Sequence, residues 1–143
     1  MTDIPRPTPE ELNARLPGYL PGVIGIEVVE VRDGAMVARM PVRSEHLAPN
    51  GYMHAASVIA LADTTCGLGT WANLPEGAQA FTTIELKSNF LGTATEGELR
   101  CTATGRHLGR NTQVWDAEVT HAETGRTVAL FRCSQMVLWP KSK

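Results

Sequence analysis

One long segment with helical periodicity, His54 to Ala72, constrains the fold of this chain more than any other feature. Val58, Leu61, Ala62 and Thr65 recur within it at the spacing of one helix face. Short segments rich in β-branched residues lie on both sides of it, bounded by Gly, Pro and Asn turns. Because one helix cannot cover both faces of a large sheet, the sequence predicts an antiparallel sheet curled around the helix. Its outer face or an edge would then be free for a second subunit.

The expected elements are a short N-terminal helix, two strands, the long helix and four more strands. Thr8 and Pro9 supply an N-cap and a first-turn proline for the short helix, and Pro17-Gly18 ends it. In Phe81–Phe90, Thr82, Ile84, Leu86 and Phe90 are expected on one face and Thr83, Glu85, Lys87 and Asn89 on the other. The other expected boundaries are Thr8–Leu16 (helix), Gly25–Glu30 and Ala35–Val42 (strands), Ser44–Met53 (loop), and Glu98–His107, Thr112–Thr120 and Arg126–Leu138 (strands).

Composition narrows the class of protein. The 143 residues fit one domain, predicted as 1–143 with a helical N-terminal extension at 1–20. A net charge of −2 argues against a general nucleic-acid binder. The three cysteines lack metal-ligand spacing, and no segment resembles a secretory signal or a membrane span. We therefore expect a cytoplasmic protein with reduced thiols and no membrane partner.

Asp63 does not fit the helix that carries it. The side chains three and four positions away belong to Ile59, Ala60, Cys66 and Gly67, and none of them is a cation. Aspartate is a poor helix former, and burying its charge without a partner is costly or raises its pKa. The residues leave two explanations open. Asp63 is either a solvated or loop-bonded structural residue, or a catalytic carboxylate beside small side chains that leave room for a ligand.

His54 begins the same helix. The N–H groups of Ala55 and Ala56 have no partners inside the helix, and the helix dipole makes this end positive. Such an end can polarise a carbonyl group or hold an oxyanion. The 9 residues from His54 to Asp63 (63 − 54 = 9) span about 13.5 Å, so the two side chains cannot meet in one subunit. The structural alternatives are that His54 orders the preceding loop and that Asn50 forms a turn.

The residues around this helix resemble a known signature. Asn50-Gly51-x-x-His54-Ala55-Ala56, followed by Leu61-Ala62-Asp63, is similar to the N-G-x-x-H-G-G…L-A-D pattern of the PaaI-like acyl-CoA thioesterases of the hot-dog fold. Thr82–Lys87, Asn89–Leu91 and His107–Asp116 look like that family's strand after the helix and its penultimate hairpin. The resemblance covers roughly Val23 to Pro140.

This resemblance implies an α+β hot-dog fold, in which an antiparallel sheet wraps around one long central helix. It implies homodimers, often paired into homotetramers, with active sites at the dimer interface. Asp63 is then the carboxylate that attacks the thioester or activates water, and the Ala55 N–H is the oxyanion donor. Asn50 and His54 position the thioester carbonyl or the water. Thr83 matches a hydroxyl that in some relatives faces the carboxylate across the interface. No cofactor is implied, because CoA is part of the substrate.

The chain departs from the signature immediately after the histidine. Ala55-Ala56 stand where the family has Gly-Gly. A backbone N–H survives this change, so the oxyanion donor can persist, but the added methyl groups can narrow the pocket. Efficiency and substrate size are therefore in question more than the type of reaction.

The phosphates of CoA predict a cationic surface. Arg106, His107 and Arg110 flank Gly109 in one turn, and Asn111 follows. By resemblance this turn lies near the nucleotide, so Arg106, Gly109, Arg110 and Asn111 are the expected CoA contacts. The alternative is a solvated hairpin tip.

Three functions follow. The first is a thioesterase for aryl- or short- to medium-chain fatty-acyl-CoA, which needs an oxyanion donor and a carboxylate. The second is a catalytically weak acyl-CoA or small-ligand binder on the same fold, motivated by Ala55-Ala56. The third is a hydratase or dehydratase, whose D-x-N-P-x-H motif is missing. The sequence also lacks the G-x-S-x-G and H-E-x-x-H motifs, so no metal is predicted, and Cys66 is expected to fill space rather than attack.

Overall fold

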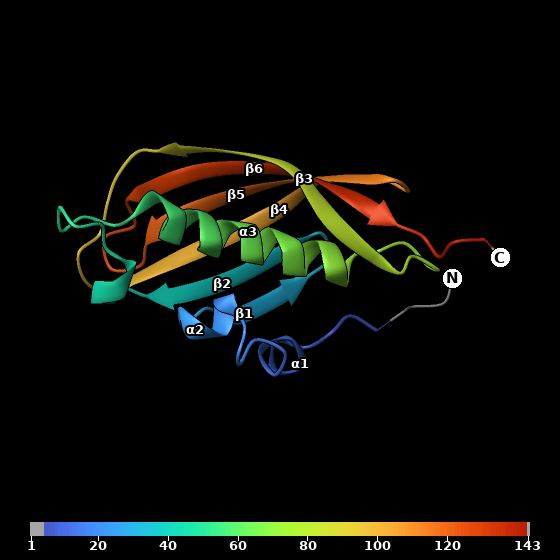
Figure 1. The fold of residues 1–143 in the computed structure, drawn as a ribbon, viewed down its shortest axis with the longest axis horizontal. Coiled ribbons are helices and arrows are strands. Elements are labelled where there is room, and N and C mark those ends of the chain that lie inside the picture. The colour runs from blue at the N-terminus through green and yellow to red at the C-terminus, as the bar shows by residue number, and fades with distance from the viewer. Residues whose placement is uncertain (1–4, 143) are drawn as a thin grey trace.

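The computed structural model describes residues 5–142, which form one six-stranded antiparallel sheet and one long helix. The chain leaves the sheet after β2 and returns as β3 at the opposite edge, with α3 (Ala55–Ala72) in the connection, so the sheet order is β1-β2-β4-β5-β6-β3. The sheet curves around α3, which is the predicted hot-dog arrangement (Figure 1). The strands are β1 (Glu27–Arg32), β2 (Ala35–Pro41), β3 (Ala80–Phe90), β4 (Glu98–Leu108), β5 (Thr112–His121) and β6 (Thr127–Leu138).

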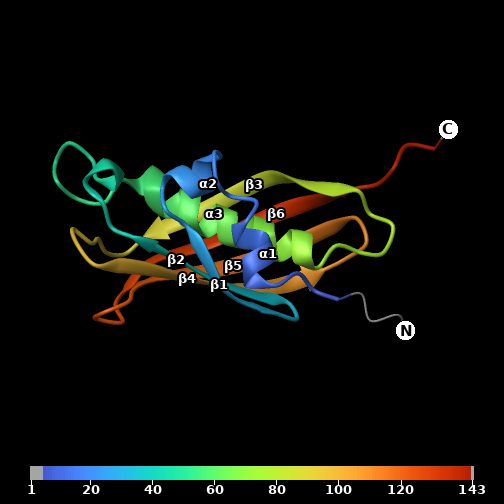
Figure 2. The same cartoon turned by 90° about the horizontal axis from the view of Figure 1, so that it is seen from below.

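The long helix α3 lies lengthwise over the concave face of the sheet (Figure 2). His54 is its N-cap rather than its first helical residue. The predicted core face is confirmed, because Val58, Leu61, Ala62 and Thr65 are all buried. The same buried cluster continues into the sheet, with large side chains that include Met36, Met40, Leu99, Trp115 and Phe131.

The N-terminal helix is shorter than predicted. α1 spans Pro9–Asn13 and has the expected N-cap, in which the Thr8 side chain accepts a hydrogen bond from the Glu11 N–H. After Asn13 the backbone hydrogen bonds join residues three positions apart instead of four. The Leu16 N–H, for example, donates to the Asn13 carbonyl, so the α-helix does not reach Leu16. Two further short helices were not predicted, namely α2 (Leu20–Val23) and the 3₁₀ helix η1 (Ser44–His46).

The predicted strands all exist, and most of their boundaries lie within one residue of the prediction. β1 shows the largest difference, since it begins at Glu27 rather than Gly25. Gly25 has a φ of +83°, which is the left-handed region, so it belongs to the turn that leads into the strand.

The predicted alternation of side chains along β3 is wrong at Thr83. The register with β6 shifts between Thr83 and Glu85, which marks a β-bulge at Ile84. Thr83 lies opposite Gln135 and Leu86 lies opposite Cys133, and both of these partners are buried on the helix-facing side. The extra residue therefore places Thr83 and Leu86 on the same face, toward the helix.

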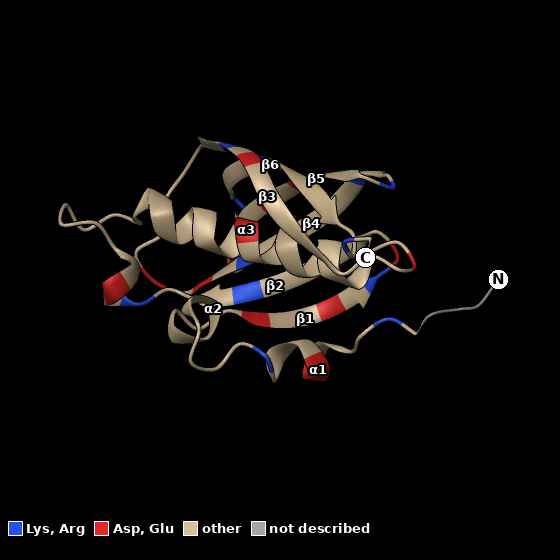
Figure 3. Ribbon diagram, turned by 45° about the vertical axis from the view of Figure 1, so that its right-hand side comes forward, with Lys and Arg blue, Asp and Glu red and all other residues tan. Residues whose placement is uncertain are grey.

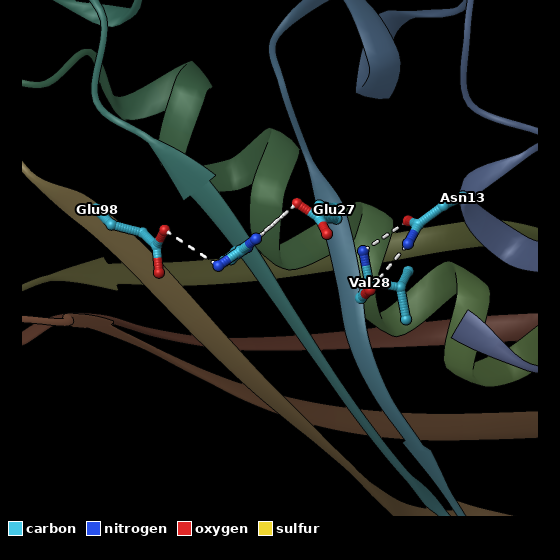
Figure 4. Close-up of polar contacts among 5 residues, drawn as sticks. Asn13, Glu27, Val28 and Glu98 are labelled. Atoms are coloured by element: carbon cyan, nitrogen blue, oxygen red, sulfur yellow. Dashed lines mark hydrogen bonds and ion pairs between the residues drawn. The ribbon is translucent and has the colours of Figure 1, made fainter. Parts of the chain in front are cut away.

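The two edges of the sheet differ. At β1 the side-chain amide of Asn13 donates to the Val28 carbonyl (2.9 Å) and accepts from the Val28 N–H (2.7 Å), as a neighbouring strand would (Figure 4). Beside it, Arg39 links Glu27 and Glu98 across the outer face. At the other edge, β3 pairs only with β6 among the described strands. The edge at β1 is thus occupied by the chain's own N-terminal segment, and the edge at β3 is open.

Candidate active site

Asp63 is the only charged residue of α3, which appears in Figure 3 as one red band on an otherwise tan helix. The residue is half-buried, and its Oδ1 atom is buried with no hydrogen-bond partner among residues 5–142. Burial raises the pKa of Asp63 above its ordinary value of 3.8, because desolvation disfavours the charged form. A carboxylate with this environment is a better base than an exposed aspartate, which favours the catalytic explanation over the solvated one.

The start of α3 presents a free donor. The Ala56 N–H donates to His54 Nδ1 at 2.9 Å, and the Ser57 N–H donates to the His54 carbonyl. Within the described part of the chain, the Ala55 N–H makes no hydrogen bond. Because Nδ1 accepts, it carries a lone pair, so any ring proton of a neutral His54 is on Nε2. His54, Ala55 and Ala56 are exposed, so this end of the helix is open to a ligand.

The loop before the helix holds Asn50 at the tip of a tight turn. Its Oδ1 accepts from the Tyr52 N–H at 3.1 Å, and Gly51 has a φ of +85°. Asn50 is exposed, and its amide nitrogen makes no hydrogen bond within residues 5–142, so it can donate to a ligand. The structure therefore places Asn50 just before the helix start, with one of its two polar atoms committed to its own turn.

One chain does not bring the two halves of the expected site together. Along α3, the Ala55 N–H and Asp63 lie 8 residues apart (63 − 55 = 8), or about 12 Å. Asp63 does not line any of four surface hollows of about 400 to 650 Å³ that residues 5–142 form. A substrate carbonyl held at the Ala55 N–H is thus out of reach of the Asp63 carboxylate of the same helix.

Thr83 lies in β3 on the helix-facing side. Its hydroxyl donates to Oε1 of Gln135 at 2.7 Å. Gln135 was not among the predicted site residues. The available signal was the alternation of the last strand, which puts a glutamine in phase with the buried Cys133 and Val137.

The expected CoA contacts separate into two places. Arg110 lies at the tip of the turn between β4 and β5, with its guanidinium stacked 4.4 Å above the Trp139 ring. Beside it, the Asn111 carbonyl accepts from Val137 and the Gly109 N–H donates to Thr112. Arg106 instead lies on the outer face of the sheet, 3.7 Å from Asp116, in a hollow of about 580 Å³. Arg106 and Arg110 therefore do not form one patch.

The thiols are poor nucleophiles. Cys66, Cys101 and Cys133 are free and fully buried. A hydrogen bond with Cys133, together with burial, raises the pKa of the Cys66 thiol well above its usual range, and burial raises the pKa of Cys101 to about 12. Cys66 thus fills space on α3, as predicted.

Residues 5–142 contain no group of three His, Cys, Asp or Glu side chains arranged to hold a metal ion. None of their helices is long and apolar enough to cross a membrane.

Comparisons with known proteins agree with the fold and with the reaction. The sequence profile of the Thioesterase superfamily matches residues 50–132. The 1,4-dihydroxy-2-naphthoyl-CoA hydrolase of Escherichia coli is 30% identical over 131 residues, which cover 92% of this chain and 95% of the relative.

Solved structures are similar over most of both chains. A mutant thioesterase from Pseudomonas aeruginosa superposes with a TM-score of 0.87 and 26% identity, covering 92% of this chain and 94% of that one. The PaaI protein of the E. coli phenylacetic acid degradation operon superposes with a TM-score of 0.75 and 28% identity, covering 82% and 83%.

Proposed function

We propose, from the premise that this chain belongs to the thioesterase superfamily and is a thioester hydrolase, that it cleaves acyl-CoA to a free acid and CoA. The acyl group is an aryl or a short- to medium-chain fatty acyl group. One observation carries the assignment of the catalytic residue, namely the half-buried Asp63 carboxylate without a partner among residues 5–142. The relative that hydrolyses 1,4-dihydroxy-2-naphthoyl-CoA supports the aryl class.

The residues support a two-part mechanism. The Ala55 N–H at the positive end of α3 binds the thioester oxygen and stabilises the negative charge that develops on it. His54 and Asn50 lie beside this donor and orient the carbonyl or the water. Asp63 either removes a proton from water or attacks the carbonyl carbon itself, and the CoA thiolate then leaves as the C–S bond breaks.

The mechanism requires a homodimer, because the Ala55 N–H and Asp63 of one helix are too far apart to share a carbonyl carbon. We assign the dimer interface to the open edge of the sheet at β3. Ile84, Leu86 and Phe90 on this strand are 53%, 42% and 44% exposed, whereas the edge at β1 is bonded to Asn13. Pairing at β3 brings the helix start of one protomer toward Asp63 of its partner. The outer face of the sheet remains available for pairing two dimers into a homotetramer.

The nucleotide of CoA binds near the β4–β5 turn in this proposal. Arg110 stacks on Trp139 and is an exposed residue, so its guanidinium can donate to a phosphate, and Gly109 and Asn111 flank it. Arg106 faces the outer hollow instead, so its contribution to CoA binding is the smaller one.

A panel of aryl- and fatty-acyl-CoA substrates tests the function through release of free thiol. We expect turnover by the wild-type protein and a loss of about 100-fold or more in kcat for Asp63→Asn, since proton transfer by a positioned side chain contributes at least this much. Asp116→Asn is the matched control, because this acid lies on the outer face and pairs with Arg132. Full activity of Asp63→Asn would refute the assignment of the carboxylate.

A second candidate function rests on Ala55-Ala56. The two methyl groups lie at the exposed start of α3, where the carbonyl must approach the backbone. A catalytically weak acyl-CoA-binding protein would bind the substrates in calorimetry but release no thiol. Thiol release by the wild-type protein separates the two candidates. Ala55→Gly then tests the cause, because removing the methyl group should raise the activity of a protein that this methyl group makes weak.

A further inference from the structure

Gln135 lies in the core, where a polar side chain must be bonded at both ends. It is 0% exposed and belongs to the helix-facing side of β6, opposite Thr83. Its Oε1 accepts the Thr83 hydroxyl at 2.7 Å, and its Nε2 donates to the Cys133 sulfur at 3.4 Å. A buried amide without partners is costly, so these two contacts hold the side chain in one orientation.

A line of contacts leads from Gln135 to the turn of α3 that carries Asp63. Cys66 follows Asp63 by three residues, and its thiol pKa is raised first by its interaction with Cys133, then by burial, with a smaller contribution from the Asp63 charge. Gln135, Cys133 and Cys66 are all 0% exposed, so this line runs through the core beneath the helix.

A second contact fixes where β3 meets the helix. A Cβ on Gly67, four residues after Asp63, would come within 3.4 Å of the Phe81 ring. Phe81 is two residues before Thr83 and lies on the same face of the strand. Thr83 is itself exposed and lies on the edge strand, so its hydroxyl is open to solvent on the strand that meets the helix at Gly67.

We propose that Gln135 is a positioning residue that fixes the direction of the Thr83 O–H bond, so that Thr83 presents only lone pairs to the attacking water. The inference rests on the proposed function and deepens it. A threonine hydroxyl has one hydrogen to donate and two lone pairs to accept with. The Thr83 hydrogen is donated to Gln135, so the Thr83 hydroxyl can only accept hydrogen bonds from other groups.

The consequence is a defined orientation for water. A water molecule between Thr83 Oγ1 and the Asp63 carboxylate donates one hydrogen to each and keeps a lone pair for the thioester carbon. As that lone pair forms the C–O bond, the proton on the Asp63 side passes to the carboxylate. The C–S bond then breaks, and the CoA thiolate takes the proton from Asp63. In this arrangement Asp63 acts as a general base rather than as a nucleophile.

Without the Gln135 acceptor, the Thr83 hydroxyl is free to rotate. It then donates to the Asp63 carboxylate or to the water lone pair. The first contact stabilises the charged carboxylate and weakens the base, and the second blocks the attacking electrons. Both effects lower kcat more than they change substrate binding.

A mutant cycle tests this inference, with Gln135→Met as the central variant because methionine keeps the side-chain length and removes the acceptor. We expect kcat to fall about tenfold or more, a part of the contribution of the general base, with KM nearly unchanged. The acid limb of the kcat–pH profile moves to lower pH, because a hydrogen bond to its charged form lowers the pKa of Asp63. Thr83→Val should lower kcat similarly, and the double variant should be no slower than either single variant, since the two residues act as one unit.

Gln113→Met is the matched control. Gln113 is the register neighbour of Gln135 and is also 0% exposed, but its partners are Asn73 and Trp115. Its replacement costs comparable stability and leaves kcat and the pH profile unchanged. If Gln135→Met fails to fold, the comparison of Thr83→Ser with Thr83→Val still tests the inference. Thr83→Ser keeps the hydroxyl and should retain activity, whereas Thr83→Val should lose it.

The outcomes are distinct. Three results would each overturn the positioning role of Gln135 without contradicting the thioesterase function. They are an unchanged kcat in Gln135→Met, multiplicative losses of kcat in the double variant, and equal activity of Thr83→Ser and Thr83→Val. Absence of thiol release by the wild-type protein overturns the proposed function and this inference together.

Discussion

The indole ring of Trp115 lies directly against the backbone of Gly69. A Cβ built on Gly69 would come within 2.9 Å of two ring atoms, closer than real Cβ contacts allow. Trp115 is 0% exposed and its Nε1 donates to the buried Gln113, so the ring has no free direction in which to move. The glycine is therefore what allows α3 to lie this close to β5.

We predict that Gly69→Ala destabilises the fold by about 1–3 kcal/mol, as overpacking of a core does. Gly67→Ala is the control, because its new Cβ meets the Phe81 ring at 3.4 Å and alanine improves helix propensity by up to about 1 kcal/mol. Urea unfolding of both variants measures the difference. Equal stability of the two variants would contradict the packing argument.

Asp63→Asn should stabilise the protein at neutral pH. Burial raises the folded-state pKa of Asp63 above its ordinary value of 3.8, so the fold favours the neutral form. The stability from that preference is complete below pH 3.8 and is lost as pH rises through the folded-state pKa. At pH 7 the charged carboxylate is therefore a cost that asparagine removes, and we expect the Tm to rise by a few degrees. Below pH 3.8 the two proteins should melt together.

Asp116→Asn should change the Tm in the opposite direction, lowering it at neutral pH in the same thermal scans. The hydrogen bond from Arg132 lowers the pKa of Asp116 below 3.8, so its ionised form is the favoured one in the folded protein. The contribution of Asp116 to stability is present at neutral pH and disappears as pH falls through the lowered pKa.

A lower Tm for Asp63→Asn than for wild type at pH 7 would show that the Asp63 carboxylate is not desolvated.

Asn13→Ala should cost about 1–3 kcal/mol, because it leaves the Val28 N–H and carbonyl without their partners at a half-buried position. It also exposes the edge at β1, so we expect slow aggregation on storage. Urea unfolding and light scattering measure the two effects. Asn89→Ala, an exposed position on the outer face, is the control. If Asn13→Ala is as stable as the wild type, water replaces the hydrogen bonds of the Asn13 amide without a loss of folding free energy.

Leu86→Lys should break the dimer and abolish activity, since it puts a charge into the β3 surface that we assign to the interface. Leu130→Lys is the control on the outer face, with 47% exposure against 42% for Leu86. It should keep the dimer and its activity and disrupt only the pairing of dimers. Sedimentation velocity gives the oligomeric state of each variant. A dimeric Leu86→Lys would move the interface away from β3.

Arg110→Ala should raise the KM for acyl-CoA about tenfold, because a hydrogen bond to a charged group contributes ~1.5–3 kcal/mol. An acyl-pantetheine substrate, which lacks the nucleotide, should show the same KM with both proteins. Arg126→Ala, in the turn between β5 and β6, is the control for a general loss of positive charge. An equal KM for acyl-CoA in Arg110→Ala and wild type would remove Arg110 from the CoA site.

Local chemistry explains which predictions from the sequence hold. The core face of α3 depends on residues within a few turns of one another, and Val58, Leu61, Ala62 and Thr65 are buried as their spacing predicts. The unpartnered state of Asp63 follows from its near neighbours on one helix. The turn at Asn50 is likewise a property of four consecutive residues, and the structure shows it closed by the Asn50 side chain.

The face that Thr83 occupies could not be read from alternation, because one extra residue at Ile84 reverses every side chain before it relative to those after it. Arg106 and Arg110 are four positions apart, yet a second register shift, between Gly105 and His107, accompanies their separation onto different surfaces. A β-bulge has no sequence motif as definite as that of a turn.

The sequence by itself determined the long helix, the number of strands and the isolated carboxylate at Asp63, because each depends on residue types and spacings within one element. Only the tertiary structure decided that Gln135, 52 residues along the chain, takes the Thr83 hydrogen, and that Asn13 occupies the edge at β1 while the edge at β3 stays open. These relationships join segments that the chain brings together only when the sheet closes around α3, and no local pattern records which partner a buried hydrogen bond or a free edge will find.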